Sequence, residues 1–280
     1  MQQITDPKRL RALLKAQTTN HRSIGFVPTM GNLHQGHLSL VRRARAQADF
    51  VVVSIFVNPL QFDREDDLAG YPRTLQEDAR LLEQEGVNLL YAPQTEDLYP
   101  ADLATTTRVE VPEVTERLEG RSRPGHFSGV TTVVAKLFNL IQPDIAIFGE
   151  KDFQQLKVIE KMVRDLNIPV TILSEPIVRE TDGLAMSSRN SRLDATERQQ
   201  AVKLHETLGK IAEVIRLGGQ DFRKLEAKGV EMLEKHGFGV DYLEICRSVD
   251  LMPANAGDLS LVILVAAWLG DTRLIDNLQI

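Results

Sequence analysis

The feature that most constrains the fold is an alternation of short apolar runs with amphipathic segments of helical periodicity. Residues 24–27 and 50–57 are almost wholly apolar, as in strands that are buried on both faces of a parallel sheet. Between them, residues 37–48 repeat apolar side chains at helical spacing. This order predicts a strand–helix–strand unit, because parallel strands need a crossover connection.

The same alternation continues along the chain. Thr74, with Glu77 three residues on, predicts a helix that opens with a capping box and ends near Gly86. A strand is expected at 89–92, followed by helices at 130–141 and 153–166 and strands at 145–148 and 170–173. The pattern predicts an α/β domain with a Rossmann-like, mainly parallel sheet, in which ligands bind at the carboxyl ends of the strands.

After about residue 176 the pattern changes. A helix is expected from Asp194, with Glu197 three positions on, and the remaining elements are a helix at 221–236 and strands near 242–246, 261–266 and 272–275. We therefore expect two domains: a Rossmann-like N-terminal domain over residues 1–175 and a smaller α+β domain over residues 176–280.

Composition narrows the class of partner. The net charge is −6 with both signs interspersed, whereas nucleic-acid binders concentrate basic residues on one surface. No apolar run reaches the roughly 18 residues of a membrane span, and residues 1–8 lack the apolar core of a secretory signal. The single cysteine, Cys246, cannot form an internal disulfide, as suits the cytoplasm. We expect a cytoplasmic protein with small-molecule partners, no nucleic acid and no membrane.

The most informative motif is residues 28–37, at the junction between the first strand and the first helix. Free backbone N–H groups at a helix start attract anions, and Gly31 and Gly36 permit a close backbone approach. His34 and His37 can donate hydrogen bonds to phosphoryl oxygens. Two other interpretations are a pair of surface histidines and a metal site, although no carboxylate or cysteine lies close by to complete the latter.

A second polar junction follows the strand at 50–57, where Pro59 prevents its continuation. Asn58 and Gln61 then project from the carboxyl end of a central strand, and their neutral amides can bind a carboxylate or hydroxyl. The alternative is that both amides only cap the loop.

A third junction, residues 148–155, follows a later strand. Lys151 can neutralise charge on the phosphates of a nucleotide, with Glu150 and Asp152 as tethers for the lysine. A surface ion pair is the alternative interpretation.

A fourth motif, residues 183–190, carries two hydroxyls and a guanidinium that suit a polyphosphate. Gly183 gives the segment hinge freedom, although a serine-rich turn before the next helix would look the same. Residues 121–127, which include Arg123 and His126, fit either a positive rim for an acidic substrate or an exposed turn.

The residues 34–37 are similar to the histidine signature shared by nucleotidylyltransferases and class I aminoacyl-tRNA synthetases. The longer string 28–37 resembles the pantothenate synthetase family, and the match is densest over residues 24–190. The resemblance implies an ATP-dependent ligase that joins pantoate to β-alanine through a pantoyl-adenylate, with Mg²⁺ accompanying ATP, and a homodimer.

The resemblance also implies roles for individual residues. His34, His37, Lys151 and Arg189 are the expected catalytic residues, with His37 as proton donor. Pantoate and β-alanine are expected to contact Asn58, Gln61, Arg123 and Gln155, and Asp78 is a candidate magnesium ligand. The expected ATP-binding residues are Met30, Gly31, Asn32, Leu33, His34, Gln35, Gly36, His37, Gly149, Glu150, Lys151, Asp152, Val178, Met186, Ser187, Ser188 and Arg189.

Three alternative functions stay open at this stage. A nucleotidylyltransferase would keep the adenylyl group in its product, but residues 58–62 resemble the ligase. An aminoacyl-tRNA synthetase would be expected to carry a basic RNA-binding appendage, which the sequence lacks. A non-catalytic ATP-binding protein would not need the full set of His34, His37, Lys151 and Arg189.

Overall fold

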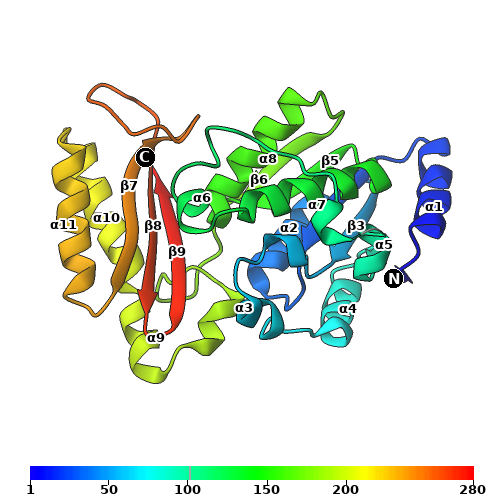
Figure 1. Cartoon of the computed structure of the whole chain (residues 1–280), viewed down its shortest axis with the longest axis horizontal. Coiled ribbons are helices and arrows are strands. Elements are labelled where there is room, and N and C mark those ends of the chain that lie inside the picture. The colour runs from blue at the N-terminus through cyan, green and yellow to red at the C-terminus, as the bar shows by residue number, and fades with distance from the viewer. Residues whose placement is uncertain (101) are drawn as a thin grey trace. The chain divides into compact units, whose positions relative to one another are not determined.

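A computed structural model describes residues 1–100 and 102–280 (Figure 1). The chain divides into two compact units, one of Met1–Glu150 with Val158–Pro176 and the other of Lys151–Lys157 with Ile177–Ile280. The expected domain boundary between residues 175 and 176 stays a prediction. No helix in the described part of the chain has the length and apolar character needed to cross a membrane.

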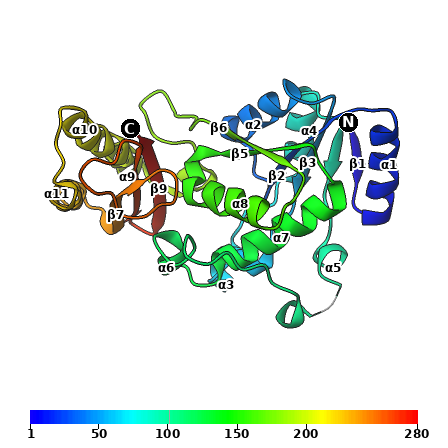
Figure 2. The ribbon, with the colours of Figure 1, turned by 90° about the horizontal axis from the view of Figure 1, so that it is seen from above.

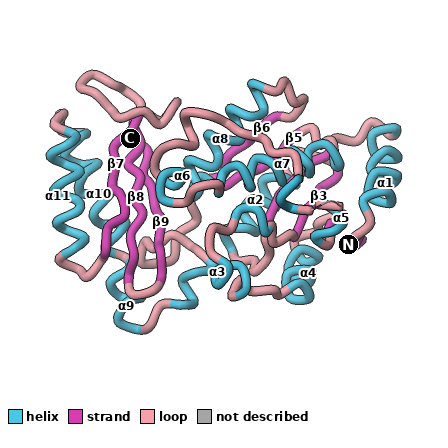
Figure 3. The backbone as a smooth tube through the Cα atoms, in the orientation of Figure 1, coloured by secondary structure: helices cyan, strands magenta, loops and turns pink. Residues whose placement is uncertain are grey.

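The first unit contains a six-stranded sheet in the order β1-β4-β3-β2-β5-β6, and every paired strand in it is parallel. Figure 3 shows strands in magenta and helices in cyan. The sheet confirms the predicted Rossmann-like α/β class. β2 lies between β3 and β5, so the order of strands reverses at β2. The strands are β1 (Gln2–Ile4), β2 (Ile24–Thr29), β3 (Phe50–Ile55), β4 (Leu89–Tyr91), β5 (Ile145–Gly149) and β6 (Thr171–Glu175).

Helices lie on both faces of this sheet, α2 and α4 on one and α7 on the other (Figure 2). Val53 shares an apolar cluster with Leu38 of α2, and Phe26 packs edge-on against Phe138 of α7, with ring centroids 6.3 Å apart. Burial on both faces is the reason that the strand sequences are almost continuously apolar. The α-helices here are α1 (Pro7–Thr19), α2 (Gln35–Arg45), α3 (Glu65–Ala69), α4 (Leu75–Gln84), α5 (Thr95–Leu98), α6 (Glu119–Ser122) and α7 (His126–Ile141); α8 (Phe153–Asp165) follows, and the short 3-10 helices are η1 (Pro59–Gln61), η2 (Leu103–Thr105) and η3 (Glu150–Asp152).

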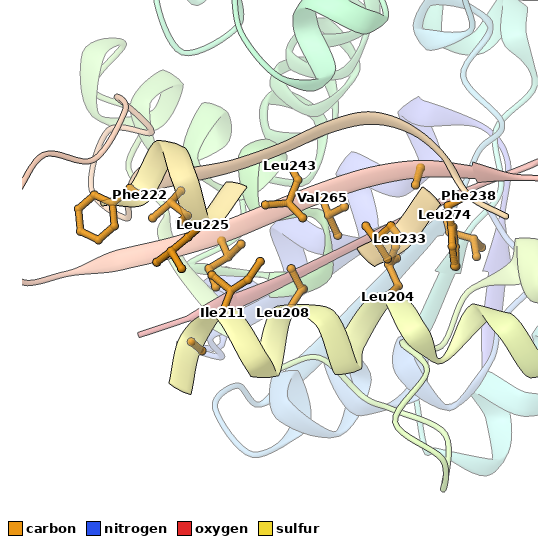
Figure 4. Close-up of a cluster of buried hydrophobic side chains, with 14 of the residues drawn as sticks. Leu204, Leu208, Ile211, Phe222, Leu225, Leu233, Phe238, Leu243, Val265 and Leu274 are labelled. Carbon is orange, nitrogen blue, oxygen red and sulfur yellow. The ribbon is translucent and has the colours of Figure 1, made fainter. Parts of the chain in front are cut away.

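The second unit contains the antiparallel sheet β7-β8-β9, with α10 and α11 on one face. Figure 4 shows Leu208 and Ile211 of α10 beside Leu243 and Val265 of the sheet, within one buried apolar cluster. The cluster gives this unit a core of its own, as predicted for an α+β segment. Its elements are η4 (Ser188–Arg192), α9 (Ala195–Ala201), α10 (Lys203–Arg216), α11 (Phe222–Glu234), β7 (Gly239–Arg247), β8 (Leu261–Leu269) and β9 (Thr272–Gln279).

Most elements begin or end within a few residues of the predicted boundaries, and two of the differences bear on the candidate site. β3 ends at Ile55 rather than residue 57, because the chain turns toward η1 ahead of Pro59. α7 begins at His126 rather than residue 130, so His126 lies in a helical turn and is buried rather than in an exposed loop.

The predicted capping box at Thr74 is wrong. The Thr74 hydroxyl donates to the Asp78 carboxylate at 3.1 Å, and the Thr74 side chain makes no capping bond to the helix. Glu77 pairs with Arg80 instead. A box of this kind does open α9, where Asp194 and Glu197 each accept the other's backbone N–H.

Candidate active site

The loop between β2 and α2 is held in place by a buried carboxylate on α4. Asp78 is only 1% exposed and accepts the N–H groups of Asn32 at 2.9 Å and Leu33 at 2.8 Å. Gly31 and Asn32 have positive φ angles of 83° and 51°. A Cβ atom at Gly31 would lie 3.0 Å from an Asp78 oxygen. The loop therefore needs glycine at this point, and Asp78 fixes its course.

His34 and His37 are oriented by hydrogen bonds to their Nδ1 atoms. The N–H of His34 donates to Nδ1 of His37 at 3.3 Å, and the N–H of Gly36 donates to Nδ1 of His34 at 3.1 Å. The ring centroids are 4.1 Å apart. A neutral imidazole that accepts at Nδ1 carries its proton on Nε2. Both rings are thus set up as Nε2–H donors, the form suited to a phosphoryl oxygen.

The expectation of free backbone N–H groups at this helix start is wrong for four residues. The N–H groups of Asn32 and Leu33 bind Asp78, and those of His34 and Gly36 bind the imidazoles. Buried backbone N–H groups need hydrogen-bond acceptors. The Asp78 carboxylate and the two imidazoles provide these acceptors within the protein. Donation to a bound anion would then fall to the imidazole rings.

The second junction is a buried network of amides. Asn58 is 1% exposed; its Nδ2 donates to Gln61 Oε1 at 3.0 Å and to the Gly129 carbonyl at 3.1 Å. The Tyr99 hydroxyl donates to Asn58 Oδ1 at 2.9 Å. The Gln61 amide nitrogen lies 3.2 Å from the Met30 sulfur. Asn58 therefore orients the Gln61 side chain.

Gly129 allows α7 to approach η1 closely. A Cβ atom at this position would lie 2.2 Å from the Leu60 carbonyl oxygen, a distance that no side chain can tolerate. The glycine thus lets its own carbonyl reach Asn58, and the position of Gln61 depends on this contact.

Arg123 and His126 both contact the backbone carbonyl of Gln61. Arg123 donates to the Gln61 carbonyl at 3.3 Å and to the Asp63 carboxylate at 3.1 Å, and His126 Nδ1 lies 2.8 Å from the Gln61 carbonyl oxygen. Burial raises the pKa of Asp63, but the charge of Arg123 and hydrogen bonds outweigh this effect and bring that pKa below its ordinary value. Direct contact of Asn58 or Arg123 with substrate stays a prediction.

The loop after β2 and the end of β5 emerge at the same edge of the sheet, because the two strands are parallel neighbours. Gly149 ends β5, and the Glu150 carboxylate accepts the Ser174 hydroxyl at 2.7 Å. The order of strands reverses at this point, and open α/β sheets bind ligands at such reversals. Asp152 is exposed at the end of η3, and Gln155 is half-buried on α8.

In the second unit, the motif with Ser187 and Arg189 follows a small hairpin. Met186 donates to the Val178 carbonyl at 3.0 Å, and the turn contains Gly183 with a φ of 96°. The Ser187 hydroxyl accepts the Arg189 N–H at 3.2 Å. Ser187 thereby caps η4, which begins at Ser188.

Two residues of β9, which the sequence did not indicate, contact Lys151 and the base of the hairpin that precedes Ser187. Arg179, at the base of the hairpin, donates to both oxygens of Asp276 at 2.8 and 3.0 Å. Asn277 Nδ2 donates to the Lys151 carbonyl at 3.0 Å. A signal was present, since Asp276 and Asn277 are consecutive polar residues between the apolar Ile275 and Leu278.

His205 also lies beside Asp276, with its Nδ1 atom 3.7 Å from the carboxylate. Burial lowers the pKa of His205, and the nearby Arg179 lowers it further, while Asp276 and Glu206 act in the opposite direction. The ring packs against the hairpin turn, because a Cβ atom at Gly183 would lie 3.1 Å from it. The neutral imidazole therefore serves as packing for the turn.

A family model described as pantoate-beta-alanine ligase matches residues 2–279. The chain belongs to this family. The predicted family and the predicted enzyme class, a ligase, are thus confirmed.

Similar proteins agree with this assignment over the whole chain. A pantothenate synthetase of Pseudomonas entomophila is 53% identical over 280 residues, covering 100% of this chain and 98% of that protein. One from Azotobacter vinelandii is 55% identical over 273 residues, covering 98% and 96%.

Solved structures of family members share the fold. A pantothenate synthetase from Thermus thermophilus has a TM-score of 0.92 at 46% identity, with 99% of each chain covered. A pantoate-beta-alanine ligase from Francisella tularensis, complexed with beta-gamma ATP and beta-alanine, has a TM-score of 0.81 at 36% identity, covering 99% of this chain and 97% of that one.

Proposed function

We propose that the chain joins pantoate to β-alanine in a reaction driven by ATP, through a pantoyl-adenylate intermediate. The family match over residues 2–279 supports the two substrates, and the Francisella tularensis relative is a complex with an ATP compound and β-alanine. The observation that carries the proposal is the orientation of His34 and His37, both of which accept at Nδ1. That orientation makes each ring a donor suited to phosphate.

In the first step, a carboxylate oxygen of pantoate attacks the α-phosphorus of ATP. The bond from that phosphorus to the oxygen bridging to the β-phosphorus breaks, and pyrophosphate leaves with the electron pair. Negative charge grows on the phosphate oxygens, where preorganised donors are most effective. We assign the Nε2–H groups of His34 and His37 to these oxygens, with His37 as the proton donor.

In the second step, the amine of β-alanine attacks the acyl carbon of the adenylate. The bond between the acyl carbon and the AMP oxygen breaks, AMP leaves, and the nitrogen loses a proton to form the amide. AMP is a good leaving group, so the protein needs mainly to position the reactants and exclude water. We assign this positioning to Gln61 and Gln155, which bind pantoate through its hydroxyls and carboxylate before the adenylate forms.

The network around Gln61 supports its assignment. Asn58 binds its side chain, and Arg123 and His126 bind its carbonyl. A residue whose backbone and side chain are both held in place loses little conformational entropy when it binds a substrate. We propose that Asn58, Arg123 and His126 act through Gln61.

The phosphates of ATP are assigned to cationic and hydroxyl groups that follow β5 and the hairpin. Lys151, Ser187, Ser188 and Arg189 would stabilise the pentacoordinate phosphorus and the departing pyrophosphate. The remaining proposed nucleotide contacts are Met30, Gly31, Asn32, Leu33, Gln35, Gly36, Gly149, Glu150, Asp152, Val178 and Met186.

We propose that magnesium enters with ATP, bound to phosphate oxygens and water, since it retains several waters in most sites. No group of three or more His, Cys, Asp or Glu residues in the described chain could hold a metal ion. Asp78 does not fit a direct ligand, because it is 1% exposed and both oxygens already accept hydrogen bonds. We assign it to the histidine loop instead.

The direct test is AMP release from ATP and magnesium, with pantoate and β-alanine supplied singly and together. We expect catalytic AMP release only with both substrates. A nucleotidylyltransferase would retain AMP in its product, and an aminoacyl-tRNA synthetase would lose activity after nuclease treatment. ATP binding without turnover in any mixture would contradict the proposal. A cytoplasmic location and a homodimer stay predictions.

A further inference from the structure

Two consecutive residues of β9 contact Lys151 and Arg179, and Arg179 lies at the base of the hairpin that leads to Ser187. Asn277 donates from Nδ2 to the Lys151 carbonyl at 3.0 Å. Asp276 accepts two hydrogen bonds from Arg179, and Arg179 also donates to the Asn277 carbonyl at 3.3 Å. Asp276 and Asn277 are each only 3% exposed. Lys151 and Arg179 are therefore attached to one rigid strand.

The hold on Arg179 extends to the Ser187 segment through the hairpin. Arg179 itself pairs with Ala185 across the hairpin in an isolated antiparallel bridge, and Arg179 Nη1 also donates to the Gly183 carbonyl at 3.1 Å. Ser187 follows two residues after Ala185. The hairpin cannot shift without breaking the contacts of Arg179 to β9.

The far end of the segment is fixed as well. Asn190 donates to the Glu180 carboxylate at 3.0 Å and to the Ala185 carbonyl at 3.1 Å. Arg198 of α9 donates to Glu180 at 2.8 Å. The residues on both sides of 187–189 therefore form hydrogen bonds with the hairpin.

We infer that Asp276 and Asn277 are positioning residues for adenylyl transfer, which set Lys151 and the Ser187–Arg189 segment in a fixed relation. The inference rests on the proposed function, because the ligand of both segments is taken to be the polyphosphate of ATP. Buried ion pairs contribute little to stability compared with apolar packing, so we attribute the two buried polar side chains of Asp276 and Asn277 to a need for precise geometry. Misplacement of a binding group by about 1 Å can reduce a rate about 100-fold.

The test is pantoate-dependent exchange of pyrophosphate into ATP, measured without β-alanine. Asn277→Ala and Asp276→Asn should each lower the exchange rate at saturating pantoate by about 10- to 100-fold, with the KM for pantoate within about twofold of wild type. Asp241→Asn is the matched control, because it alters an ion pair with Arg273 in the same sheet. We expect the control to stay within about twofold of wild type.

A second measurement separates positioning from general damage. Asn277→Ala should weaken ATP binding in calorimetric titration, but should have little further effect in a Lys151→Ala background, because coupled residues are not additive. Additive losses, or equal losses in Asp241→Asn, would overturn the inference. If Asp276→Asn does not fold, Asn277→Ala decides alone, and an unchanged exchange rate overturns the inference. Absence of exchange in the wild type would instead refute the proposed function.

Discussion

Replacing Asp78 with alanine should release the loop that carries His34 and His37. The change removes a buried carboxylate that accepts two backbone N–H groups, those of Asn32 and Leu33. Hydrogen bonds to a charged group contribute about 1.5–3 kcal/mol each, so the expected loss is about 3–6 kcal/mol. For a unit of this size, that corresponds to a fall in Tm on the order of 10 °C.

The assay is thermal unfolding together with pantoate-dependent pyrophosphate exchange. In Asp78→Ala the exchange rate and the Tm should both fall. The rate falls because the imidazoles lose their fixed orientation. Glu77→Ala is the control, since Glu77 is on the same helical turn but pairs with Arg80 at the surface, where its side chain is 57% exposed. That variant should match wild type in both measurements.

The magnesium dependence distinguishes the two roles considered for Asp78. If Asp78 binds the metal, its replacement by alanine should raise the magnesium concentration needed for half-maximal exchange. A residue that holds the loop would leave this concentration unchanged while lowering the maximal rate. A raised magnesium requirement, or a Tm and rate equal to those of Glu77→Ala, would refute the reasoning.

Three further outcomes follow from the first unit. His37→Ala should lower kcat by about 100- to 1,000-fold, as loss of one charge-stabilising donor does, and steady-state kinetics of the complete reaction would measure it against an unchanged KM for β-alanine. Gly129→Ala should destabilise the unit by about 1–3 kcal/mol through a clash with the Leu60 carbonyl and raise the KM for pantoate; calorimetry and kinetics check both effects. Burial alone would raise the pKa of Asp63, but beside Arg123 this pKa lies below its ordinary value. The ionised Asp63 therefore stabilises the fold at neutral pH, and this contribution is lost as the pH falls below about 4. Melting curves of Asp63→Asn across that range should lack this part of the pH dependence.

The parallel sheet was predictable because its strands are buried on both faces. β2, β3 and β5 consist mainly of short apolar runs, which are typical of buried strands. β1 was missed because it is three residues long and two of them are exposed glutamines. α10 was missed as a separate helix because only Val202 divides it from α9.

The candidate site was predictable as far as it depends on the ends of strands. Parallel strands bring their carboxyl ends to one edge, so polar motifs that follow them can be recognised from order alone. Contacts between distant parts of the sequence could not be found in this way. Asn277 and Lys151 are 126 positions apart, and Thr74 binds Asp78 rather than opening a capping box, because tertiary partners compete with local ones.

The most direct measurement is the fate of ¹⁸O from pantoate labelled in its carboxylate, after complete reaction with ATP and β-alanine. Adenylation predicts that one labelled oxygen appears in AMP, because the carboxylate oxygen that attacks the α-phosphorus leaves with it. Label in inorganic phosphate, with ADP as the second product, would mean that the γ-phosphorus is attacked. That result would contradict the roles proposed here for His34, His37 and Lys151.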